Sequence, residues 1–108
     1  MAGISFIGNN GAFTGTAAAL GTITGTQGRG IVFKVVTSGT ETVSVAGLIS
    51  EAVASSKYMC YSLLTGALHS SADMDDGTYF IPRIYTHDLT FTGSSTSDTK
   101  TVTYRMID

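Results

Sequence analysis

Hydrophobic and polar residues alternate with a period of two along much of this chain. In the segment 30–37, "GIVFKVVT", Ile31, Phe33 and Val35 share one face, while Lys34 lies on the other. The same alternation recurs in the segments 41–47, 89–93 and 100–107. Successive side chains of a β-strand point to opposite faces, so a single apolar face predicts antiparallel strands that pack on a core from one side.

The segments between these strands carry turn residues. They are "GTQGRG" at 25–30, "TSGTE" at 37–41, "TG" at 65–66, "DMDDG" at 73–77 and "GSSTSDT" at 93–99. We interpret 25–30 as a turn before the strand at 31, 65–66 as a tight hairpin and 93–99 as an exposed, mobile loop. Short strands at this spacing predict an all-β fold, an antiparallel β-sandwich or jelly roll, in a single domain over residues 1–108.

Two segments leave the secondary structure open. Residues 11–30 are low in large side chains, and form either an irregular strand or part of an arm that orders only against a partner. We treat residues 1–12 as the candidate N-terminal arm. Residues 48–57, "LISEAVASSK", could hold one short helix capped by Ser50, although nucleation is costly in so short a segment.

The composition favours a protein that works in an assembly. Only 13% of the residues are charged, against about a quarter in typical globular domains, so the surface must consist mainly of Thr, Ser and Gly. Such a surface repels neighbouring molecules weakly. With so few charges to protect them, the edge strands of a sandwich are expected to be paired or covered by another chain.

Charge and hydropathy exclude several classes of partner. The net charge is −2 with no cluster of Lys and Arg, which predicts no nucleic-acid binding. No apolar run approaches the roughly 20 residues of a membrane span, and the N-terminus has no signal-peptide pattern. A single cysteine, Cys60, excludes an intrachain disulfide and fits assembly in a reducing cytoplasm.

Three aspartates, Asp73, Asp75 and Asp76, are the best candidates for a metal site, because hard cations prefer several oxygen ligands. Counting from Asp73, Gly77 stands at position 5, whereas a calcium-binding loop requires Gly at position 6. Asp is also a preferred turn residue. We therefore interpret the segment as a turn and predict no metal site.

No arrangement of residues predicts catalysis. His87 and Asp88 are neighbours, as are His69 and Ser70, and neighbours in a strand point to opposite faces. The glycine-rich segment 25–30 has neither the Lys-Ser/Thr pair of a phosphate-binding loop nor a βαβ unit around it. We predict that the protein is not an enzyme and binds no cofactor.

A row of side chains suggests a contact surface. If residues 78–85 form one strand, Tyr79, Arg83 and Tyr85 share a face, and the core face carries Phe80, Pro82 and Ile84. Tyr and Arg are enriched at protein–protein hot spots, so the row is a candidate interface, unless the Tyr rings pack over a neighbouring strand. The further interface candidates are Arg29 in the turn and Phe6 and Phe13 in the N-terminal part.

The order of these elements resembles small β-sandwich proteins of tailed bacteriophage virions. In that group a "V-x-V-x-G-L" strand and a "D-G-x-Y-x-I" strand recur. The matching residues are Val43, Val45, Gly47 and Leu48, and then Asp76, Gly77, Tyr79 and Ile81. Some members also carry an "S-L-D-G-x-x-W" hairpin, but here "SLLTGALH" has Thr65 in place of the Asp and no Trp, which weakens transfer from sugar-binding relatives.

The resemblance implies a structural protein of the virion, assembled in the host cytoplasm. We expect a capsid decoration (cement) protein that binds across subunits of the major capsid protein, or another virion protein, as a homo-oligomer, with a trimer favoured. The alternative expectation is a carbohydrate-binding module or a tail or head–tail accessory protein.

Overall fold

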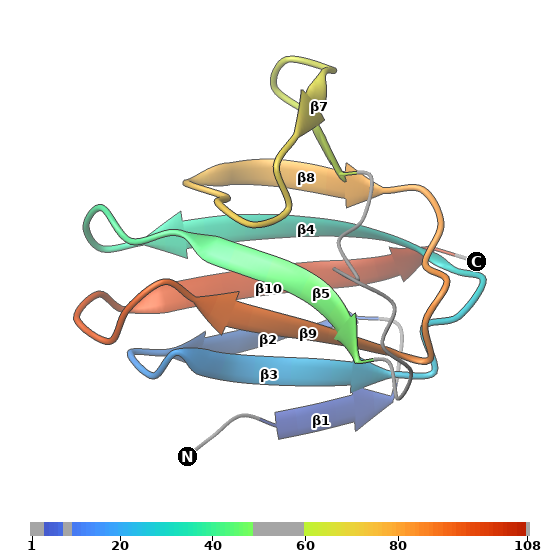
Figure 1. Cartoon of the computed structure of the whole chain (residues 1–108), viewed down its shortest axis with the longest axis horizontal. Helices are drawn as coiled ribbons and strands as arrows, with labels where there is room; N and C mark the ends of the chain where they lie inside the picture. Colours follow the sequence, from blue (N-terminus) through green and yellow to red (C-terminus); the bar gives the residue numbers. More distant parts are fainter. Residues whose placement is uncertain (1–3, 8–9, 49–59, 108) are drawn as a thin grey trace.

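The computed structural model describes residues 4–7, 10–48 and 60–107. These residues form an all-β fold of two sheets packed face to face, which confirms the predicted sandwich (Figure 1). Their strands are β1 (Ile4–Ile7), β2 (Asn10–Gly15), β3 (Ala19–Thr24), β4 (Gly30–Thr37), β5 (Val43–Leu48), β6 (Cys60–Ser62), β7 (Leu68–His69), β8 (Gly77–Ile81), β9 (Asp88–Gly93) and β10 (Lys100–Ile107). No helix in this described part is long and apolar enough to cross a membrane.

One sheet has four strands in the order β1-β3-β9-β5, and the other has six in the order β2-β10-β4-β8-β6-β7. We call them the four-stranded and the six-stranded sheet. The pair β1–β3 is parallel, and the other pairs of named strands are antiparallel. The range 1–12, considered above as an arm, therefore contains β1 and the beginning of β2. Of the candidate helix at 48–57, Leu48 belongs to β5 and the remainder lies outside the described residues.

In the long strands, the residues that the sequence pattern predicts for the core are buried. In β4, Ile31, Phe33 and Val35 are buried while Lys34 is exposed, and β10 alternates in the same way. The aromatic rings of the two sheets meet at Phe91 of β9, whose centroid lies 5.2 Å from that of Phe33 and 6.0 Å from that of Phe13. Burying rings of this size contributes a large share of the hydrophobic stabilisation.

A short segment after β7 ties the two sheets together. Its Met74 exchanges two backbone hydrogen bonds with Val43 of β5, at 2.8 and 2.9 Å, and the N–H of Val45 donates to the carbonyl of Ser71 at 2.8 Å. The chain enters this segment from the six-stranded sheet and returns to that sheet in β8. The outer edge of β5 is thus covered by the chain itself.

The predicted hairpin is present, but it is wider than a tight turn at 65–66, because residues 63–67 lie between its strands. Strands β6 and β7 pair antiparallel, and the N–H of Gly66 donates to the carbonyl of Ser62 at 2.7 Å across the turn. Figure 1 shows this hairpin projecting beyond β8 at one side of the sandwich. It carries three exposed leucines: Leu63, Leu64 and Leu68.

Candidate functional site

Three of the predicted interface residues come together at one end of the sandwich. Arg29 lies in the turn between β3 and β4, and Arg83 and Tyr85 lie in the segment between β8 and β9. The two connections are paired through their backbones: the N–H of Gly28 donates to the carbonyl of Ile84 at 2.7 Å, and the N–H of Ile84 donates to the carbonyl of Arg29 at 2.8 Å. We call this pair of connections, residues 25–29 and 82–87, the loop-pair end.

A buried threonine, Thr26, holds the two connections of the loop-pair end together by hydrogen bonds. Thr26 is fully buried; its hydroxyl lies 2.8 Å from the carbonyl of Thr86 and 2.9 Å from that of His87, and its N–H donates to the latter at 2.9 Å. Gly28 supports the turn with a φ of 82°, a conformation that side chains other than glycine adopt rarely. The connection that carries Arg83 and Tyr85 is therefore held by hydrogen bonds at Ile84 and at Thr86 and His87.

Arg83 and Tyr85 form one exposed unit. Ile84 between them is fully buried and anchors the segment in the core, while the Tyr85 side chain is 69% exposed. The guanidinium carbon of Arg83 lies 5.5 Å from the centroid of the Tyr85 ring, which is cation–π distance. A cation stacked on an aromatic ring loses less side-chain freedom on binding, because much of that freedom is already restricted in the free protein.

The predicted position of Tyr79 in this row is wrong. Tyr79 is only 3% exposed: it lies in β8 on the core side, where its ring stacks on Phe33 with 5.7 Å between centroids. Its hydroxyl donates to the carbonyl of Asp75 at 2.7 Å. Burial, together with the charge of Asp75, raises the pKa of Tyr79 to about 12. The core face of β8 accordingly carries Tyr79 and Ile81, whereas Phe80 is half-buried and Pro82 is exposed.

Phe13 is also a core residue. It is 3% exposed, stacks on Tyr104 with 5.5 Å between centroids, and lies directly against Gly21 of β3, where a Cβ atom would collide with the ring. Its role as an exposed contact is therefore wrong. For Phe6 the structure gives the backbone position in β1, opposite Ile23 of β3.

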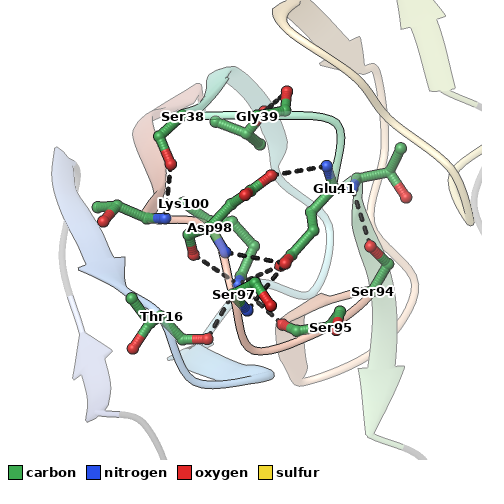
Figure 2. Close-up of polar contacts among 12 residues, drawn as sticks. Thr16, Ser38, Gly39, Glu41, Ser94, Ser95, Ser97, Asp98 and Lys100 are labelled. Carbon is green, nitrogen blue, oxygen red and sulfur yellow. Dashed lines mark hydrogen bonds and ion pairs between the residues drawn. The ribbon is translucent and has the colours of Figure 1, made fainter.

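The sequence analysis missed a buried polar cluster at the opposite end of the sandwich (Figure 2). Lys100 is completely buried, and its ammonium group lies 2.8 Å from Glu41 Oε1. Three backbone carbonyl oxygens, those of Thr16, Ser95 and Asp98, also lie 2.8 to 3.0 Å from the same nitrogen, so its three N–H groups are shared among four acceptors. The second carboxylate oxygen of Glu41 accepts the N–H groups of Ser97 and Asp98, each at 2.8 Å.

This cluster changes the interpretation of the segment 93–99. Its serines are exposed as predicted, but the backbone is held on both sides by Glu41 and Lys100, and Asp98 Oδ2 accepts the N–H of Glu41 at 2.8 Å. One signal in the sequence could have revealed the cluster. Lys100 has the same strand parity as the buried Val102 and Tyr104, so alternation directs it inward.

The contacts of the Glu41 carboxylate predict that the stability falls at acid pH. The hydrogen bond from Lys100 lowers the pKa of Glu41 below its ordinary value of 4.5, and the N–H groups of Asp98 and Ser97 lower it further, against a partial opposing effect of burial. A carboxyl group whose pKa is lower in the folded state stabilises the fold above its unfolded pKa and loses that contribution as the pH falls through the folded pKa.

We therefore expect the urea midpoint of the wild type to fall as the pH decreases below about 4.5, and to fall less in Glu41→Gln. Urea titrations of both proteins between neutral and acid pH measure the difference. If the urea midpoint fell equally with pH in the two proteins, the result would contradict a role for Glu41 in acid sensitivity. Lys34→Gln, which removes an exposed charge on β4, is the control.

The structure places His69, Asp75 and Asp76 in contacts with neighbouring strands and rings. Asp76 Oδ1 accepts the N–H of Thr37 at 2.8 Å, a contact between segments distant in the chain and not the local turn bond that the sequence suggested. His69 lies edge-on to Tyr79, with its Nε2 3.7 Å from Asp75 Oδ1. In the part of the chain that the structure describes, no three His, Cys, Asp or Glu side chains are grouped so that they could hold a metal ion.

His87 and Asp88 lie closer together than strand geometry suggested. His87 precedes β9 and does not belong to it, so its Nε2 reaches within 3.9 Å of Asp88 Oδ1. The His87 side chain is 73% exposed. Cys60 is buried with its sulfur 3.8 Å from that of Met74, and burial raises its pKa to about 11, so the thiol is unreactive at neutral pH.

Comparison with protein-family models, with curated proteins and with solved structures found no match for this chain. The functional assignment therefore depends on the fold and on the loop-pair end, where Arg83 and Tyr85 are the exposed side chains that the structure holds in a defined arrangement.

Proposed function

We propose that the protein is a structural component of a virion, a capsid decoration protein that binds the assembled shell through the loop-pair end. The observation that carries the proposal is the stacked, exposed pair of Arg83 and Tyr85 on a connection fixed by hydrogen bonds. Arg and Tyr are enriched among the residues that dominate protein–protein binding, and a pair that is already ordered binds at a lower entropic cost.

The remaining surface supports this use. With 13% charged residues and a net charge of −2, the protein opposes close packing against neighbours only weakly. A protein of this kind stabilises a shell because it binds the assembled lattice and not the separated subunits, so that bound protein shifts the equilibrium toward the lattice. The partner in this proposal is the major capsid protein or a neighbouring virion protein, met in the host cytoplasm during assembly.

The decisive experiment adds the purified protein to particles that lack it. We expect wild-type protein to sediment with the particles and to raise their melting temperature. Arg83→Ala and Tyr85→Ala should each weaken binding about 10- to 100-fold, which corresponds to the roughly 2 kcal/mol of a hot-spot residue. Because the two side chains stack on each other, the double variant should lose less than the product of the two single losses.

Arg105→Ala is the matched control, since Arg105 is an exposed arginine on the outer face of β10. It should bind as the wild type does, and all five proteins should have the same melting temperature in isolation. Wild-type protein that does not bind particles, or Arg83 and Tyr85 variants that bind as tightly as Arg105→Ala, would refute the proposal. Binding to tails instead of heads would reassign the protein to the accessory class.

Carbohydrate binding is the second candidate, because the exposed Tyr85 ring could stack on a sugar. The buried Tyr79 can no longer extend such a platform. Titration of the protein with a panel of cell-surface glycans tests this alternative. Glycan binding that Tyr85→Ala abolishes, without particle binding, would favour it.

A further inference from the structure

Strand β2 is an edge strand, and the structure identifies which of its backbone groups face outward. Its neighbour is β10, with Ala12 opposite Thr103 and Phe13 opposite Val102, and the register runs without a bulge. In an antiparallel pair, opposite residues alternate between those that exchange hydrogen bonds and those that do not. If one hydrogen-bonded pair of β10 is known, the alternation gives the direction of all the remaining backbone N–H and C=O groups of β10 and β2.

Such a pair lies at the beginning of β10. The N–H of Ser38 donates to the carbonyl of Thr99 at 3.0 Å, one step beyond the pairing of Thr37 with Lys100. By alternation Thr101, Thr103 and Arg105 direct their backbone groups to β4. The residues between them direct theirs to β2, where the opposite residues are Gly15, Phe13 and Gly11.

The backbone N–H and C=O groups of the other three β2 residues consequently point away from the sheet. These residues are Asn10, Ala12 and Thr14. Among the described residues, none of the three has a backbone hydrogen-bond partner. Their side chains are exposed and uncharged, and β2 contains no proline, so the strand lacks the usual devices that block pairing with another strand.

The space beside β2 is bounded on one side by the other sheet. Phe13 of β2 lies against Gly21 of β3, so β2 and β3 are stacked across the core. The four-stranded sheet continues beyond β3 with β1, as Figure 1 shows below β3, whereas the six-stranded sheet ends at β2. The six-stranded sheet is thus one strand short at the place that faces β1.

This geometry excludes a second copy that pairs its own β2 edge here. Two identical antiparallel edges are related by a two-fold axis perpendicular to the sheet, which would bring β3 and β1 of both copies into the same space. A single extended strand meets no such obstacle. It would pair with Asn10, Ala12 and Thr14 on one side, and its alternate side chains would face β1 and solvent.

We propose that the β2 edge receives an extended segment of another polypeptide chain, which completes the six-stranded sheet by strand addition. The segment would span about six residues to match β2, with apolar side chains at alternate positions toward β1 and small or polar ones toward solvent. The main-chain hydrogen bonds supply affinity, and the alternation supplies selectivity. The inference is independent of the proposed virion role, because it concerns another surface and needs no particle.

Amide hydrogen exchange followed by NMR tests it on the intact protein, with a synthetic peptide of the sequence KTVTYRMI as the probe. This sequence is that of β10, which pairs antiparallel with β2 on the opposite side and has the required alternation. In free protein, the amides of Ala12 and Thr14 should exchange at least about 100-fold faster than those of Gly11 and Phe13. Adding the peptide should slow the exchange of the Ala12 and Thr14 amides by about tenfold or more, and a scrambled peptide should not.

Ala12→Pro and Thr14→Pro complete the test. Each removes one outward N–H and no bond to β10, so both variants should stay folded, but they should lose the response to the peptide. Equal protection of Ala12 and Phe13 in the free protein, unchanged amides at millimolar peptide, or a peptide response that both proline variants retain would overturn the proposal. Protection of Ala12 that grows with protein concentration alone would also overturn it, since that outcome indicates self-association at this edge.

Discussion

Replacing Lys100 with methionine is expected to lower the free energy of unfolding by about 3 to 5 kcal/mol, a range measured when one partner of a buried ion pair is removed. The ammonium group is completely buried and lies within hydrogen-bond distance of Glu41 Oε1 and three carbonyl oxygens. Methionine is of similar size, but it leaves the carboxylate without its cation and the carbonyls without a donor. Urea denaturation at neutral pH, followed by circular dichroism, measures the loss.

The double variant Lys100→Met/Glu41→Gln separates the charge from the packing. Once both charges are removed, no uncompensated ion remains, so the double variant should be more stable than Lys100→Met alone. Thr103→Met, at an exposed position on the same strand, should change the stability by less than about 0.5 kcal/mol. A Lys100→Met protein as stable as the wild type would show that the cluster makes no net contribution.

Replacing Phe91 with alanine is expected to cost about 3 to 5 kcal/mol, as for large-to-small changes of buried aromatic residues. Phe91 is fully buried and contacts rings of the opposite sheet, Phe33 edge-on and Phe13 in a tilted geometry. Its removal takes away the central contact between the layers and leaves a cavity. Chemical denaturation measures the loss, and a shift in the midpoint without a change in slope would indicate that the denatured state is unaffected.

Val36→Ala on β4 is the control for this variant, because Val36 is 43% exposed on the outer face. It should cost no more than about 0.5 kcal/mol. A Phe91→Ala variant that loses less than about 1 kcal/mol would contradict the arrangement of the two sheets described here, since a ring in that position cannot be removed without loss of contact area.

The sequence was sufficient to predict the fold class and the core face of the long strands. In β10 buried and more exposed residues alternate over all eight positions, and in β4 they alternate from Ile31 onward. The core side of β4 carries Ile31, Phe33 and Val35, although the outer face also holds apolar residues such as Val36. The period of a strand depends only on backbone geometry, so it can be read without knowledge of the neighbouring strands.

The same reasoning failed after β8 for a physical reason. The prediction extended one strand over residues 78–85, which required Tyr79, Arg83 and Tyr85 to share a face. The strand ends at Ile81, before Pro82, whose ring nitrogen has no hydrogen to continue the ladder. Beyond Pro82 successive residues no longer alternate between two faces. Ile81 and Ile84, three positions apart, are both buried.

The site could be predicted only in part, because its contacts join distant segments. Arg29, Arg83 and Tyr85 were identified by residue type, but their common location depends on the pairing of Gly28 with Ile84, which no local pattern encodes. Glu41 and Lys100 are likewise 59 residues apart in the chain. Tyr79 was placed on the surface because a single strand over 78–85 would put it on one face with Arg83 and Tyr85. In the structure it is buried, and the carbonyl of Asp75 accepts its hydroxyl inside the fold.

The position of β10 in the middle of the six-stranded sheet has a consequence for folding during synthesis. β2 and β4 are both made early, but they are joined only through residues 100–107, which a ribosome adds last among the described strands. Until then neither strand has its central neighbour, and the first half of the chain cannot close its core. Folding should therefore wait for the synthesis of β10 and be slow for a domain of this size, as is usual where sequence-distant strands must pair.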